Sequence, residues 1–132
     1  MNYSGKKVLI VGMARSGFAA AKTLLRLGAN VTVNDQKALS DFEERINELE
    51  GCDMQFAVDP CTLIDSMDVV VISPGIPIDS RFILEAKAKG IKVIGEVELA
   101  FQLCSAPLIA ITGTNGKTTT TALTGRIFND AG

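Results

Sequence analysis

Short apolar runs alternate along this chain with segments of helical pattern, and that alternation limits the folds open to it. Residues 7–11 carry a continuous apolar run, as expected of a strand that is buried on both faces. Joined by right-handed crossovers, such strands form a parallel, doubly wound α/β sheet, for which we predict the order 3-2-1-4-5. The five strands are predicted at residues 7–11, 31–33, 54–58, 68–72 and 92–94.

Helices are predicted between these strands, each ending near a glycine or at a new apolar run. Ser40 is expected to cap an amphipathic helix with Phe42, Ile46 and Leu49 on one side, and Glu43 stands where a capping box needs it. The other predicted helices are residues 18–27, a short helix that begins at Asp59-Pro60, residues 79–89 and residues 96–104.

Ala106-Pro107 marks a boundary in the chain. We predict a five-stranded Rossmann-like domain at 1–105, followed at 106–132 by the first strand (108–111) and first helix of a truncated second domain. A strand and one helix of about 25 residues are too few to bury a core independently. This second part is therefore expected to fold back on the first domain, to pair with another chain in self-association, or to stay mobile.

Composition excludes several classes of partner. A net charge of −2 over 132 residues lacks the clustered basic surface that binds nucleic acid or an anionic membrane. No apolar run approaches ~18 residues, so no membrane span is expected. The chain has no histidine, and Cys52, Cys61 and Cys104 show no CxxC spacing. Zinc is therefore not expected, and the thiols indicate a reducing cytoplasmic location.

The first group of candidate site residues follows the first predicted strand and runs from Gly12 to Gly17. It is a G-x-A-x-x-G form of the dinucleotide-binding turn, in which Gly12 permits the tight turn and Gly17 the close helix–strand packing. Ala14 replaces the glycine that lets the backbone approach a pyrophosphate, which weakens the case for NAD. The N–H groups of Ala14, Arg15, Ser16 and Gly17 still face whatever lies over the helix N-terminus, although a turn without a ligand gives the same pattern.

Two other strand ends add candidates at the same predicted edge of the sheet. Asp35, with Gln36, ends the second strand, where a carboxylate accepts hydrogen bonds from a ribose or a base. A lone acid here could equally cap the next turn. Ser73-Pro74-Gly75 ends the fourth strand as a stiff loop that permits close backbone approach, and a rigid turn needs no ligand to explain it.

The most specific motif lies near the end of the sequence, in Gly113-Thr-Asn-Gly-Lys-Thr118. An apolar run precedes it and a helical pattern follows, which is the layout of a phosphate-binding loop. In such a loop Lys117 reaches the outer phosphates of a nucleotide and Thr118 faces a magnesium ion. Ile111 stands where the first glycine of the full pattern would be, and a chance glycine-rich turn is the alternative.

Ile111-Thr-Gly-Thr-Asn-Gly-Lys-Thr-Thr119 resembles the shortened loop of the Mur ligases and of the related folylpolyglutamate synthases. The preceding segments Val8–Ala21, Val31–Asp35, Ser73–Pro77 and Gly95–Leu99 resemble the Mur ligases that add D-glutamate. The first turn is unlike that of the L-alanine-adding relatives, and the synthases normally begin at the ATPase domain. The resemblance covers essentially the whole chain.

This resemblance implies a monomeric three-domain enzyme that joins D-glutamate to UDP-N-acetylmuramoyl-L-alanine through an acyl phosphate, with ATP and Mg²⁺ as cofactors. It implies that Ala14 to Gly17 bind the UDP diphosphate, that Asp35 and Gln36 meet the uracil, and that Ser73, Pro74 and Gly75 line the same crevice. Lys117 and Thr118 would be catalytic, with Thr118 on the metal. The residues implied to cradle ATP are Gly113, Thr114, Asn115, Gly116, Lys117, Thr118 and Thr119.

Other family functional groups are expected beyond residue 132, so we predict that this polypeptide is not itself a ligase. One alternative is a UDP-sugar-binding module without catalysis. Another is half of an NAD-dependent oxidoreductase, which the glycine turn and Asp35 support but the phosphate-binding loop does not.

Overall fold

The computed structural model describes residues 2–42 and 47–132. Its sheet is all-parallel, with the order β3-β2-β1-β4-β5, which confirms the predicted topology. The register is regular: Val8 in the central strand lies opposite Val31 on one side and Val69 on the other. The strands are β1 Lys7–Val11, β2 Asn30–Asp35, β3 Asp53–Phe56, β4 Val69–Ile72 and β5 Lys92–Gly95.

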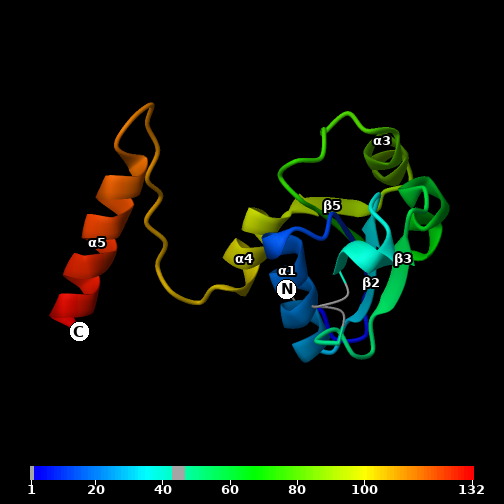
Figure 1. The fold of residues 1–132 in the computed structure, drawn as a ribbon, viewed down its shortest axis with the longest axis horizontal. Coiled ribbons are helices and arrows are strands. Elements are labelled where there is room, and N and C mark those ends of the chain that lie inside the picture. The colour runs from blue at the N-terminus through cyan, green and yellow to red at the C-terminus, as the bar shows by residue number, and fades with distance from the viewer. Residues whose placement is uncertain (1, 43–46) are drawn as a thin grey trace.

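Helices cover both faces of this sheet (Figure 1). Helices α1 (Arg15–Arg26) and α4 (Glu96–Leu103) pack together on one face, and α3 (Arg81–Ala88) packs with two short 3₁₀ helices on the other. Those 3₁₀ helices are η2 (Pro60–Thr62) and η3 (Ile64–Ser66). The remaining elements are η1 (Leu39–Phe42) and α5 (Lys117–Ala131).

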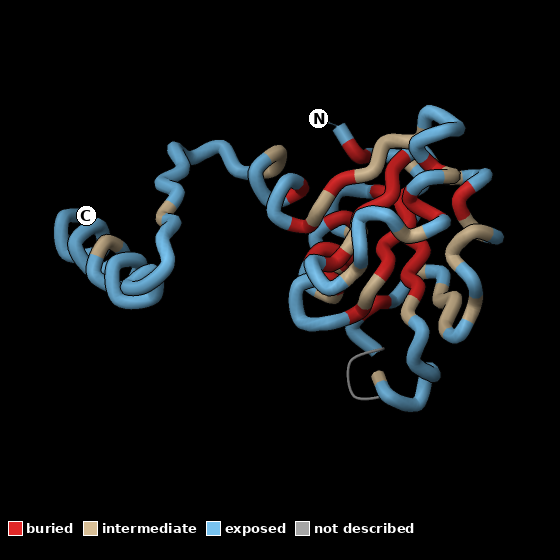
Figure 2. Tube along the Cα trace, turned by 90° about the horizontal axis from the view of Figure 1, so that it is seen from above, coloured by how far each residue is buried: buried red, intermediate tan, exposed pale blue. Residues whose placement is uncertain are grey.

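The core divides between the two faces because successive side chains of a strand point to opposite sides. In β1, Val8 and Ile10 pack into the cluster that includes Leu24 of α1, whereas Leu9 and Val11 join the cluster around Phe82 and Ile83 of α3. Figure 2 shows the buried residues concentrated inside the packed part of the chain, away from its C-terminal end. The two-sided apolar pattern of the central strands is thus explained by burial on both faces.

The predicted helix after Ser40 is only partly observable. Ser40 lies inside the short η1 helix rather than at a helix cap, and residues 47–50 form turns and coil, so a helix reaching Leu49 is wrong. Glu43 and Ile46 lie outside the described residues. Leu49 is nevertheless buried in the core, and Phe42 stacks on Phe56 with ring centroids 5.0 Å apart. The burial of Phe42 and Leu49 was therefore predicted correctly, whereas the helical conformation predicted for the segment up to Leu49 was wrong.

The predicted strand at 108–111 is not formed. Leu108 and Ile109 are exposed, and the segment leading to α5 has neither helical nor strand structure. A strand needs a neighbouring strand to receive its N–H and C=O groups, and the five-stranded sheet ends at β5. Figures 1 and 2 show this segment and α5 standing apart from the sheet, with most of their residues exposed.

Candidate functional site

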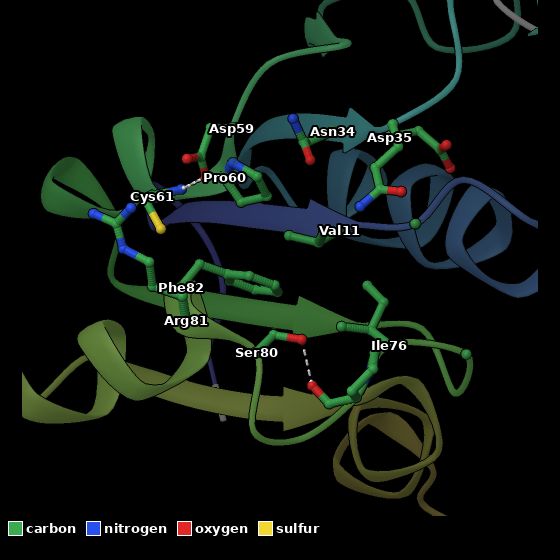
Figure 3. A pocket seen from close by; sticks show the side chains of 14 residues that line it. Val11, Asn34, Asp35, Asp59, Pro60, Cys61, Ile76, Ser80, Arg81 and Phe82 are labelled. Carbon is green, nitrogen blue, oxygen red and sulfur yellow. Dashed lines mark hydrogen bonds between the residues drawn. The ribbon is translucent and has the colours of Figure 1, made fainter.

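A cleft of about 430 Å³ opens at the carboxyl ends of the central strands. It lies at the ends of the neighbouring strands β1 and β4, the point at which strand order reverses and ligands bind in open α/β sheets. Figure 3 shows the cleft between the end of β2, the η2 helix and the start of α3. Its lining residues are Val11, Gly12, Asn34, Asp35, Gln36, Asp59, Pro60, Cys61, Gly75, Ile76, Pro77, Ser80, Arg81 and Phe82.

The turn after β1 has the close packing that its glycines predict. Gly12 has φ +95°, and its N–H donates to the Asn34 carbonyl at 2.8 Å. A Cβ at Gly17 would lie 2.0 Å from the carbonyl oxygen of Gly12, so a side chain there would collide with backbone. Both glycines are thus required by the backbone itself.

Helix α1 begins directly above this turn without a side-chain cap. Ala14 is the N-cap residue and has no side-chain hydrogen bond, and the exposed residues Arg15 and Ser16 open the helix. The first N–H groups of a helix have no intrahelical acceptor, which makes this end suited to an anion. Ala14, Arg15 and Ser16 do not line the cleft wall, and Gly17 is buried below them.

Asp35 holds the same turn from the end of β2. Its Oδ2 accepts a 2.7 Å hydrogen bond from the Met13 N–H, and its Oδ1 accepts one of 2.9 Å from the Lys37 N–H. The capping interpretation of this carboxylate is therefore realised. Each carboxylate oxygen can accept a further hydrogen bond, and both Asp35 and Gln36 line the cleft, as Figure 3 shows for Asp35.

Asn34 is a cleft residue that the sequence placed beside Asp35 and Gln36 at the end of β2 without assigning it a role of its own. It is fully buried, and its Nδ2 donates to the carbonyls of Gln55 and Val58 at 2.7 and 2.9 Å. These two acceptors fix the orientation of the amide, because the flipped group would place Oδ1 against two carbonyl oxygens. Oδ1 has no hydrogen-bond partner in the described part of the chain. The available signal was an amide side chain next to Val33, near the end of a buried strand.

The loop after β4 divides between cleft and core. Gly75 lines the cleft and Pro74 is exposed, whereas Ser73 is only 7% exposed and lies beneath the glycine turn. The Ser73 Oγ is 3.0 Å from the Gly12 carbonyl oxygen and 2.5 Å from Oε1 of Glu96. Ser73 thus supports the turn from below, while the predicted lining role falls to Gly75.

The far wall of the cleft comes from η2 and α3, which the sequence did not indicate. The Cys61 N–H donates to the Asp59 carboxylate at 2.9 Å, and this hydrogen bond lowers the pKa of Asp59. Burial and the Asp59 contact raise the pKa of the Cys61 thiol, so it is a poor nucleophile. Arg81 pairs with Glu85 at 2.7 Å, which raises the pKa of its guanidinium. The wall therefore offers both charge signs beside an apolar floor of Val11 and Phe82.

The loop from Gly113 to Thr118, which the sequence predicts to bind phosphate, lies away from this cleft. Gly113 and Gly116 have φ +152° and +78°, and the Lys117 Nζ donates to the Gly113 carbonyl within the loop. Thr118 and Thr119 are exposed in the first turn of α5. These residue types suit a nucleotide phosphate with its magnesium ion, because backbone N–H groups, one ammonium and one hydroxyl occur together at a helix start.

Metal-binding clusters and membrane-spanning helices are both absent from the described residues. In residues 2–42 and 47–132 no group of three or more His, Cys, Asp or Glu side chains could hold a metal ion. The helices in the same ranges include none that is long and apolar enough to cross a bilayer. Cys52, Cys61 and Cys104 are free thiols.

Fold and cleft together define a Rossmann-like α/β domain. Two solved structures share this fold with the chain, each covering 72% of it. Dipicolinate synthase A chain from Bacillus subtilis has a TM-score of 0.56 at 18% identity, with 38% of that chain covered. The apo-structure of D-lactate dehydrogenase from Escherichia coli has 0.52 at 19%, with 29% covered.

Sequence comparisons narrow the class to one family. The family described as "Mur ligase MurD-like, N-terminal domain" matches residues 6–95. UDP-N-acetylmuramoylalanine--D-glutamate ligase from Alkaliphilus metalliredigens is 46% identical over all of this chain, and its Staphylococcus aureus (strain MW2) counterpart is 48% identical over 97%. The chain therefore belongs to the MurD-like Mur ligases. It spans about 30% of the length of these relatives.

Proposed function

We propose that this chain is the UDP-binding part of a cytoplasmic ligase that adds D-glutamate to UDP-N-acetylmuramoyl-L-alanine during peptidoglycan precursor synthesis. Similarity to relatives named for that ligase supports the substrate class. The observation that carries the proposal is the cleft at the strand-order switch, beside a helix N-terminus that no side chain caps. An anionic nucleotide satisfies both features at once.

In this proposal the diphosphate of the substrate lies over the start of α1. The N–H groups of Ala14, Arg15, Ser16 and Gly17 would donate to its oxygens. The uracil would enter the cleft, where Asp35 and Gln36 offer acceptors and donors and Gly75 allows close approach of the backbone. Recognition would then rest mainly on backbone groups at one end and side chains at the other.

The loop from Gly113 to Thr119 would hold ATP. The N–H groups of the loop would contact phosphate oxygens, the Lys117 ammonium would leave the Gly113 carbonyl for the outer phosphates, and the Thr118 hydroxyl would face Mg²⁺. When bound, ATP supplies the phosphoryl group that activates the substrate carboxylate as an acyl phosphate.

We expect no D-glutamate-dependent ATP turnover from the 132-residue chain alone. Residues 112–120 are all exposed, so in this chain no wall shields phosphoryl transfer from water. The assay is phosphate release with UDP-N-acetylmuramoyl-L-alanine, D-glutamate, ATP and Mg²⁺ present. Turnover that requires D-glutamate would contradict this expectation.

Arg15 offers a matched test of the UDP site. Ala14, at φ −67° and ψ −173°, already has the extended conformation that proline demands of its predecessor, so Arg15→Pro removes one N–H at the first helical position with little strain. Arg15→Ala keeps the N–H and removes the guanidinium. We expect UDP affinity to fall about tenfold in the proline variant and far less in the alanine variant.

NMR titration of the chain with UDP measures both affinities. Amide shifts should centre on Ala14 to Gly17 and on Asp35, with no comparable response to NADH. A response to NADH without one to UDP would overturn the proposal and favour an oxidoreductase half-domain. Equal UDP affinities of the Arg15→Pro and Arg15→Ala variants would show that the Arg15 N–H group does not contribute to UDP binding.

A further inference from the structure

A buried cluster of oxygen atoms lies under the glycine turn, and its two side chains, Ser73 and Glu96, do not line the cleft. At its centre is the Gly12 carbonyl oxygen, which a Cβ on Gly17 would approach to 2.0 Å. On the other side, a Cβ on Gly12 would lie 2.7 Å from the Cβ and Oγ of Ser73. Ser73 in turn contacts Oε1 of Glu96, the first residue of α4, at 2.5 Å. The turn is therefore enclosed by side chains from β4's loop and α4.

Stability alone does not account for Glu96 in this place. The residue is 8% exposed, and within the described ranges its Oε2 has no hydrogen-bond partner. Burying a carboxylate with an unpaired oxygen costs free energy that an apolar side chain would not. A functional role for the contact between Glu96 and Ser73 would explain why a carboxylate occupies this buried position.

The contact determines how firmly the turn is held. The Ser73 hydroxyl has one proton and two acceptors within reach, the Gly12 carbonyl at 3.0 Å and the Glu96 carboxylate at 2.5 Å. From the opposite side, the Gly12 and Met13 N–H groups donate to β2. The turn is thus fixed between β2 and the Ser73–Glu96 pair, and its peptide planes set the direction of the N–H groups that follow.

We propose that Ser73 and Glu96 are positioning residues, which hold the Gly12 turn in the shape that binds a diphosphate. This inference rests on the proposed UDP site. Donors that are fixed in advance bind an anion better than donors that must be ordered on binding. The pair should therefore affect affinity for the diphosphate group and not for the uridine, whose contacts lie in the cleft.

The test compares UDP with uridine, because the two ligands differ only in the diphosphate. Affinities are measured by NMR titration of the wild-type chain and of Ser73→Ala, Glu96→Ala and Glu96→Gln. Glu96→Gln keeps a carbonyl oxygen that can accept from Ser73. Thr23→Ala is the matched control, since it removes a hydroxyl that donates to a backbone carbonyl of α1 at 2.8 Å, away from the turn. Thermal unfolding of each variant confirms that it is folded.

We expect Ser73→Ala and Glu96→Ala each to lower the UDP-to-uridine affinity ratio about three- to tenfold. Thr23→Ala should leave the ratio unchanged and Glu96→Gln should retain most of it. If Ser73→Ala does not fold, Glu96→Ala still tests the inference, because Glu96 lies in α4 and the same fall in the affinity ratio is expected of it. Unchanged ratios in both alanine variants, or equal losses in Glu96→Gln and Glu96→Ala, would overturn the inference while leaving the UDP site intact. Absence of UDP binding by the wild-type chain would overturn both.

Discussion

At the scale of single residues, two hydrogen bonds of its amide fix the orientation of the Asn34 side chain. Its amide joins the end of β2 to the carbonyls of Gln55 and Val58, so one donor group fixes both the cleft wall and the edge of β3. Ala57 between them has φ +55°, a conformation unusual outside glycine. The amide thus stabilises a backbone path that leaves the regular strand.

Asn34→Asp should destabilise the fold strongly, because it places a carboxylate oxygen against two buried carbonyls. We expect a loss of about 2–4 kcal/mol in the free energy of unfolding, measured by urea denaturation. Asn30→Asp is the matched control: Asn30 lies at the exposed start of the same strand and donates to the Gly5 carbonyl at 3.1 Å. Its loss should be within about 0.5 kcal/mol. Equal losses at the two positions would contradict this account.

The elements of the first domain follow from local patterns in the sequence. β1 is apolar on both faces, and the glycines at its end fit the turn into α1. Each of these patterns spans only a few residues, so the strand and the turn could be predicted from the sequence alone. The helix predicted through Leu49 failed for the opposite reason: the apolar spacing reported burial of Phe42 and Leu49 correctly, but contact with β3 decided their conformation.

Gly17 and Gly125 show how differently two helical glycines behave. Gly17→Ala would force a Cβ to within 2.0 Å of the Gly12 oxygen, so we expect a loss of about 3 kcal/mol in unfolding free energy. Around Gly125 in α5 nothing lies within 4 Å, and Gly125→Ala should stabilise that helix by about 0.5–1 kcal/mol. Urea denaturation measures the loss of stability in Gly17→Ala, and far-UV circular dichroism measures the helix content of Gly125→Ala. An unchanged free energy of unfolding in Gly17→Ala would show that the start of α1 is not in close contact with the turn after β1.

At the scale of the whole molecule, the chain has one packed domain and an exposed C-terminal part. The wide exposure of Leu108, Ile109, Leu123, Ile127 and Phe128 contrasts with the buried core between the two helical layers. Segments with few buried contacts open at little cost in free energy. The segment between α4 and α5 should therefore be the part of the chain that a protease reaches first.

Limited digestion with thermolysin, which cuts before apolar residues, should cleave first between Cys104 and Gly116. The expected product is a resistant domain containing β1 to α4, identified by mass spectrometry. Ile78 is an internal control, since it is 76% exposed but lies in a loop held by the Ile76–Ser73 and Ser80–Pro77 backbone hydrogen bonds. First cleavage at Ile78 would show that the C-terminal part is better protected than its exposure indicates.

The sequence by itself determined the parallel five-stranded order and the glycine turn after β1, because each depends on periodicity or on residues a few positions apart. Only the tertiary structure decided which polar groups meet. Ser73 reaches Gly12 across 61 positions and Glu96 across 23, and Asp59, Cys61 and Arg81 become a cleft wall only once η2 and α3 pack on the sheet. The tertiary structure also decided the conformation of residues 108–111. Their apolar pattern suits a strand, but in the described part of the chain no neighbouring strand receives their hydrogen bonds. Local propensity acts through adjacent residues, whereas hydrogen-bond partners and burial depend on the folded neighbourhood.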